Sequence, residues 1–202
     1  MMSFLQGLTM GLAYVAPIGV QNLFVINTAL ARSRRRAFAT ALIVVFFDVT
    51  LALACFFGVG AVMSRFSWLE PMILLCGSLV LLIIGTGLLR TPLAHKNEAT
   101  AELSLKRAIV TACVVTWFNP QAVIDGTMML GAFRATLPTS EAAAFLMGVV
   151  SASCLWFLGL TATISLFSHK FDARVLRAVN VVCGAVIVLY GIKLLYSFLT
   201  RF

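Results

Sequence analysis

Two acidic residues, Asp48 and Asp125, lie well inside long apolar segments, whereas the other five acids fall in polar connections or at segment ends. A charged side chain at the centre of a membrane helix costs at least about 2.5–3.5 kcal/mol on insertion scales. Each carboxyl group is therefore a candidate to bind a proton or a cationic ligand. A structural interpretation is also open, in which Asp48 is a protonated acid bonded to Thr50 or to a freed backbone carbonyl.

Amide side chains gather beside two prolines that interrupt apolar segments at matching depth. The breaks read Pro17-Ile18-Gly19-Val20-Gln21-Asn22 and Asn119-Pro120-Gln121-Ala122-Val123-Ile124-Asp125. A proline inside a helix removes a backbone hydrogen bond, and in hydrocarbon the freed carbonyl must find another donor. Gln21, Asn119 and Gln121 could supply such donors, or could bind the carboxylate or ammonium group of a substrate. The sequence leaves both roles open.

Pro17, Gly19 and Pro120 are predicted to break two helices into halves. The restarted halves offer free N–H groups, which suit an anionic carboxylate. Asp125 follows Pro120 by five residues, so capping of the restarted helix is the alternative to ligand binding. Asn22 aligns with Asp125 when the prolines are superposed, and it could act in the same two ways. Interrupted segments in corresponding halves of a chain point to the binding site of a transporter.

The elements that must position these residues are membrane helices. The chain has 202 residues, of which 61% are hydrophobic and 11% charged, too few polar residues to cover a soluble core. A spanning helix needs about 20 apolar residues. Six segments qualify, at 3–28, 37–63, 71–89, 105–133, 140–167 and 176–199. The predicted fold is an all-α membrane protein with six transmembrane helices.

Basic residues lie mainly on one side of this predicted topology. Eleven lysines and arginines fall in alternate connections, around 32–36, 90–107 and 170–177, whereas Arg65, Arg134 and Arg201 fall on the opposite side. The positive-inside rule places the eleven in the cytoplasm and both termini outside. This distribution accounts for the net charge of +8 without a nucleic-acid partner. The partners expected are the lipid bilayer and a small solute.

The two halves of the chain look like inverted repeats. Cys76-Gly77 and Cys183-Gly184 each precede an apolar run, and each half contains three segments, so the second half is upside down relative to the first. We expect one transport domain over 1–202, with repeat one at 3–89, a cytoplasmic loop at 90–107 and repeat two at 105–199. The first and fourth helices would be the proline-broken ones.

Other residues suggest no further chemistry. The five cysteines lie inside apolar runs without metal-ligand spacing, and His95 and His169 fall in loops, so neither a metal nor a cofactor is expected. Ser151 and Ser153 are predicted to serve helix packing. The sequence contains none of the GxSxG or HExxH motifs of hydrolases, which disfavours an intramembrane enzyme. A non-transporting assembly subunit remains an alternative class.

Several stretches together resemble the LysE-type lysine exporter family of bacterial amino-acid exporters, in its basic amino-acid branch. They are Phe4-Leu5-Gln6-Gly7-Leu8, Pro17-Ile18-Gly19-Val20-Gln21-Asn22, Asp48, Thr116-Trp117-Phe118-Asn119-Pro120 with Asp125, and Ser151-Ala152-Ser153 with Leu155-Trp156-Phe157. The similarity runs over nearly the whole length. It departs from the family pattern at Val20, where proline is usual, and at Gln121, where histidine is usual.

The resemblance implies export of L-arginine or L-lysine through a bacterial inner membrane, driven by proton antiport or by the membrane potential. By position it singles out Gln21, Asn22, Asp48, Asn119 and Asp125 as substrate-binding or coupling residues. Export of neutral amino acids or of another small solute is the alternative. The oligomeric state stays open, with a homodimer as one arrangement.

Overall fold

The computed structural model describes residues 1–17, 19–31, 33–58, 65–66, 68–90, 105–167 and 173–201, and every regular element within these ranges is a helix. Arg32, His169 and most of the predicted 90–107 loop, with His95, lie outside the described residues. The long helices are α1 (Met2–Val15), α2 (Val20–Ala31), α3 (Arg34–Phe57), α5 (Leu69–Arg90), α6 (Leu105–Trp117), α9 (Ala142–Phe167) and α10 (Ala173–Arg201). The short ones are α7 (Pro120–Gly126), the π-helical turn η1 (Thr127–Gly131), α8 (Ala132–Thr136) and the 3-10 turn η2 (Thr139–Glu141).

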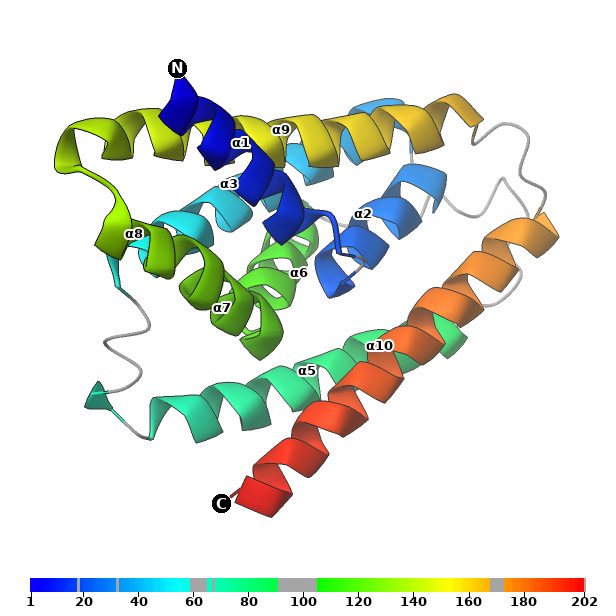
Figure 1. Ribbon diagram of the computed structural model, residues 1–202. Helices are drawn as coiled ribbons and strands as arrows, with labels where there is room; N and C mark the ends of the chain where they lie inside the picture. Colours follow the sequence, from blue (N-terminus) through cyan, green and yellow to red (C-terminus); the bar gives the residue numbers. More distant parts are fainter. Residues whose placement is uncertain are drawn as a thin grey trace.

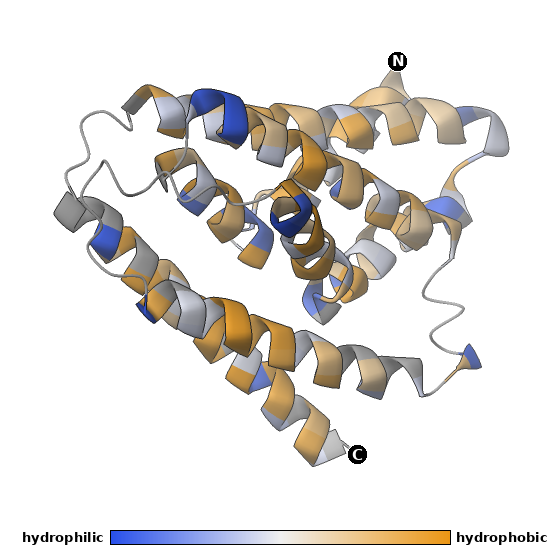
Figure 2. Cartoon of the chain, turned by 180° about the vertical axis from the view of Figure 1, so that it is seen from behind, coloured by the Kyte–Doolittle hydropathy of each residue, from blue (hydrophilic) through white to orange (hydrophobic). Residues whose placement is uncertain are grey.

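The helices have the composition of membrane spans. Three stretches, Arg34–Phe57, Thr139–Leu166 and Arg177–Thr200, are long and apolar enough to cross a bilayer, and two bent helix pairs pass the same test together. The described part of the chain therefore contains three spans, or five if each bent pair is one, and α5 adds a shorter apolar stretch at Leu75–Gly87. Hydrophobic residues cover most of the length of these helices (Figure 2).

Large apolar side chains point outward from the bundle, as expected of a surface in contact with lipid. On α10 they form a row along the helix, and in water such a row would be an aggregation liability. The exposed residues of this row are Val182, Leu189, Ile192, Tyr196 and Leu199.

Two changes of direction interrupt the bundle. The axes of α1 and α2 differ by 78°, with Pro17 and Gly19 in the link between them. The axes of α6 and the segment that follows it differ by 57°, and α7 begins at Pro120. A proline in the first turn of a helix costs no hydrogen bond, because that turn has no intrahelical acceptor for its N–H groups. Both changes of direction fall where the sequence places amides and Asp125.

Glycines let α1 pack directly against α9. A Cβ atom built on Gly7 would lie 1.9 Å from the carbonyl oxygen of Phe145, and one built on Gly11 would lie 2.7 Å from the Cβ atom of Ala152. Gly148 faces α1 from the other side, at 2.2 Å from the carbonyl oxygen of Phe4. Contacts advance together along both chains, so α1 and α9 are parallel, and small residues allow the backbones to approach this closely.

Helices α5 and α10 form a second pair, which lies side by side below the remaining helices (Figure 1). Gly85 of α5 contacts Gly184, whereas the earlier Leu82 contacts the later Gly191, so this pair is antiparallel. A cluster that includes Val20, Leu81, Val115 and Ile187 connects the pair to α2 and α6. The pair therefore forms one wall beside the bent segments.

Helix α3 occupies the centre of the bundle and brings Asp48 with it. Val44, Asp48, Leu51 and Cys55 on this helix have no exposed surface. Helices α2, α6 and α9 all contact α3. Because these neighbours cover one face of α3, Asp48 faces protein rather than lipid.

Candidate functional site

Asp48 is the centre of a hydrogen-bond network that joins four helices. The hydroxyl of Ser153, on α9, donates to Oδ2 of Asp48 at 2.6 Å, and Nε2 of Gln21, on α2, approaches Oδ1 at 3.3 Å. The same amide nitrogen donates to Oγ1 of Thr116, on α6, at 2.9 Å. Donors to a buried carboxylate offset part of the cost of removing it from water.

Two structural interpretations from the sequence need correction. Thr50 is not a partner of Asp48, because its hydroxyl donates to the carbonyl oxygen of Phe47 at 2.8 Å and accepts from Nε1 of Trp117 at 3.2 Å. Ser153, predicted as a packing residue, instead donates to Asp48. A serine in an apolar span is a hint of an interhelical hydrogen bond, but only tertiary packing shows which acid it meets.

Asn22 stabilises the first helix break. Its Nδ2 donates to the carbonyl oxygens of Val15, at 3.1 Å, and Pro17, at 2.7 Å. Its Oδ1 accepts from Nε1 of Trp156, on α9, at 2.8 Å. Asn22 thus supplies donors to the carbonyl groups at the end of α1, and it anchors the break to α9. The sequence did not single out Trp156 for this role.

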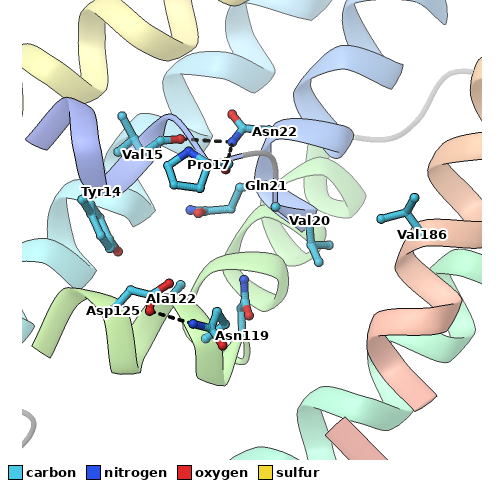
Figure 3. A pocket seen from close by; sticks show the side chains of 12 residues that line it. Tyr14, Val15, Pro17, Val20, Gln21, Asn22, Asn119, Ala122, Asp125 and Val186 are labelled. Carbon is cyan, nitrogen blue, oxygen red and sulfur yellow. Dashed lines mark hydrogen bonds between the residues drawn. The ribbon is translucent and has the colours of Figure 1, made fainter. Parts of the chain in front are cut away.

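The two helix breaks face one cavity of about 290 Å³, close to the lower end of the range for small-molecule sites. Figure 3 shows the first break on one side and α7 on the other, with Val186 of α10 on the wall beyond α2. The lining residues are Tyr14, Val15, Pro17, Gly19, Val20, Gln21, Asn22, Asn119, Gln121, Ala122, Asp125 and Val186. The cavity therefore brings together the predicted site residues apart from Asp48 and Pro120. The side chain of Pro120 is not among those that the structure describes.

Asp125 and Gln121 lie four residues apart on α7, and Nε2 of Gln121 donates to Oδ1 of Asp125 at 2.7 Å. Asp125 is partly exposed to the cavity, and the hydrogen bond that the structure gives its side chain is to Gln121 rather than to a backbone N–H group. Asn119, at the N-cap position of α7, makes no side-chain capping bond. Its side-chain oxygen Oδ1 is buried and has no hydrogen-bond partner among the described residues.

Gln21 connects the cavity to Asp48, because it lines the cavity and its amide nitrogen also approaches the Asp48 carboxyl group. Asp48 itself lies behind the wall, without exposed surface. The sequence also missed Tyr14, whose ring lies over Gly126 with its hydroxyl directed toward α7, the helix of Asp125 (Figure 3). A Cβ atom on Gly126 would lie 3.3 Å from Cε2 of this ring, so the glycine makes room for it.

The cavity wall carries polar groups of several kinds. It offers one carboxylate, several amides and the first turn of α2, which suit a small molecule that carries both signs of charge. Among the described residues, no three histidine, cysteine or acidic side chains are grouped so that they could hold a metal ion.

Comparison with known proteins gives one consistent result. The family model of the LysE type translocator matches residues 12–198. The chain is 34% identical over 188 residues to the arginine exporter protein ArgO of Klebsiella pneumoniae subsp. pneumoniae, which covers 91% of this chain and 88% of the relative. It is 32% identical to ArgO of Salmonella schwarzengrund and 31% identical to ArgO of Escherichia coli O157:H7, in both cases over 95% of this chain and 92% of the relative. No solved structure matches the chain significantly.

Proposed function

Because the chain belongs to the family of LysE-type translocators, we propose that it exports a basic amino acid, L-arginine or L-lysine, from the bacterial cytoplasm. It is a transporter and a multi-pass protein of the inner membrane. The observation that carries the proposal is the cavity between the two helix breaks, where Asp125 and four amide residues line a space of amino-acid size. The relatives named as arginine exporters support the choice of a basic substrate.

The proposed architecture is one transport domain over 1–202 with six spans, arranged as two inverted repeats. The bent segments would be the first span of each repeat, with Pro17 and Pro120 as the cause of the bends. The antiparallel contact between α5 and α10, which are the third spans of the two repeats, supports a two-fold relation between the halves. In this arrangement the loop at 90–107 is cytoplasmic and both termini face outward.

The cavity residues divide the work of binding. Asp125 attracts the cationic group of the substrate, and Gln121 orients that carboxylate through its hydrogen bond. The N-terminal turn of α2 begins at Val20, which lines the cavity, and its free N–H groups suit the substrate carboxylate. Asn22 keeps this turn directed at the cavity by stabilising the helix break. Its side chain is hydrogen-bonded to two backbone carbonyl oxygens and to Trp156, so it is not free to bind the substrate.

Asp48 is proposed to carry the exchanged proton. A carboxyl group enclosed by protein is more easily kept neutral than charged, so binding and release of a proton there changes the energy of the network strongly. Gln21 lies between this carboxyl group and the cavity. A substrate that takes a hydrogen bond from the Gln21 amide weakens the bond from Gln21 to Asp48, which links substrate binding to protonation of Asp48.

Counterflow in liposomes tests the substrate. Vesicles that contain the purified protein and unlabelled arginine or lysine should accumulate the labelled amino acid, whereas protein-free vesicles should not. Repeating the assay with each proteinogenic amino acid inside identifies the substrate class. Counterflow with neutral amino acids alone would favour the alternative exporter, and its absence for both basic amino acids would refute the proposal.

A further inference from the structure

Two buried oxygen atoms of the cavity wall lack partners. The hydroxyl of Tyr14 and the side-chain carbonyl oxygen of Asn119 have no hydrogen-bond partner among the described residues. Their residues are only 9% and 6% exposed, so neither oxygen is a surface group. Native structures leave few buried polar atoms unpaired, and each such atom calls for an explanation. Here both line the same cavity as Asp125.

The rest of the wall shows that these vacancies are local. Asn22 makes three hydrogen bonds through its amide nitrogen and oxygen, Nε2 of Gln21 makes two, and Nε2 of Gln121 donates to Asp125. Tyr14 is held in place by packing rather than by its hydroxyl, because its ring rests on Gly126 and joins the main apolar core. Both unpaired oxygens are therefore candidate acceptors for a ligand in the cavity that donates hydrogen bonds.

We propose that Tyr14, Asn119 and Asp125 form a guanidinium subsite, which makes the protein prefer arginine to lysine. This inference rests on the proposed function, since it specifies how the substrate cation is bound. A guanidinium group is planar and presents five N–H donors in a fixed fork, whereas an ammonium group is a compact, strongly hydrated charge with three donors. Acceptors from two helices, α1 and α7, and from the residue before α7 can each receive a different donor of one guanidinium group.

Tyr14→Phe tests the subsite, because it removes one oxygen and keeps the ring that packs on Gly126. The wild type should bind arginine more tightly than lysine and should reject citrulline, the neutral isostere of arginine, in competition with labelled arginine. Tyr14→Phe should weaken arginine about tenfold, the usual effect of losing one hydrogen bond to a charged group, and lysine less than threefold. Asn119→Leu, which removes the second oxygen at similar size, should lower the preference for arginine in the same direction.

Thr161→Val is the matched control. The Thr161 hydroxyl on α9 is also buried and unpaired among the described residues, but it does not line the cavity, so its removal should leave the preference unchanged. If the wild type binds arginine and both cavity variants keep its arginine-to-lysine ratio, the two oxygens are hydrated only and the subsite is refuted, while the proposed function stands. If the wild type binds neither basic amino acid, the proposed function itself fails.

Discussion

Asn22→Leu should destabilise the protein without directly removing a substrate contact. The substitution keeps the size of the side chain but removes both donor hydrogens and the acceptor. The carbonyl group of Val15 then lies buried without its donor, at a cost of about 1–3 kcal/mol. The Pro17 carbonyl and the Trp156 N–H group are only partly buried, so we assign each about 0.6 kcal/mol, the average for interhelical hydrogen bonds in membranes.

These contributions add to about 2–4 kcal/mol of lost stability. For a chain of this length each kcal/mol lowers the melting temperature by about 2–4 °C, so a decrease of about 10 °C is expected. The assay is thermal unfolding of the purified protein in detergent, followed by intrinsic fluorescence and by loss of the monodisperse peak in size-exclusion chromatography. Arginine binding below the melting temperature should be weakened only through the displaced turn of α2.

Asn119→Leu provides the comparison at the other break. Its side chain makes no capping bond and its Oδ1 has no partner among the described residues, so the same substitution should change stability by less than about 1 kcal/mol. If Asn22→Leu has the same melting temperature as the wild type but no longer binds arginine, the Asn22 amide contacts the ligand and does not stabilise the helix break. That result would refute the assignment.

Three further substitutions test the packing and the coupling. Gly7→Ala places a Cβ atom 1.9 Å from the Phe145 carbonyl oxygen, so it should lower the free energy of unfolding by at least about 1–3 kcal/mol and reduce the yield of folded protein. In the same chromatography assay the control Gly159→Ala, whose Cβ atom meets nothing within 4 Å, should be neutral or slightly stabilising. Asp48→Asn fills the same space but binds no proton, so flux driven by a pH gradient should fall at least tenfold while counterflow persists. Ser151→Ala is the control, because the Ser151 hydroxyl is bonded to its own helix. Unchanged gradient-driven flux in Asp48→Asn would exclude Asp48 from coupling. Gln21→Leu should retain counterflow at a lower apparent affinity and lose its stimulation by a pH gradient, because the hydrogen bond to the substrate and the link to Asp48 are both removed. Stimulation equal to that of the wild type would show that coupling runs by another route.

Composition and local pattern were enough to locate the helices. Apolar runs of about 20 residues can only be membrane or core helices, and the predicted segments 140–167 and 176–199 end within a few residues of α9 and α10. The same reasoning predicted helix breaks at Pro17 and Pro120, because a proline cannot donate the hydrogen bond that a continuous helix requires. It also selected Asp48 and Asp125 as candidate site residues, because an acid in an apolar run is rare and costly.

Only the tertiary structure decided which of these residues meet. Asp48 and Asp125 look equivalent in the sequence, yet one is enclosed by α2, α6 and α9 and the other faces a cavity. Asn22 and Asn119 both adjoin a proline, but one is occupied by the backbone and the other has an unpaired oxygen. The local sequence did not identify the partners of Tyr14 and Ser153, because a tyrosine or serine in an apolar helix acquires its role from the helix opposite. Helix rotation and packing set those partners, and they depend on contacts between residues more than 100 positions apart, such as Ser153 with Asp48 and Gly126 with Tyr14.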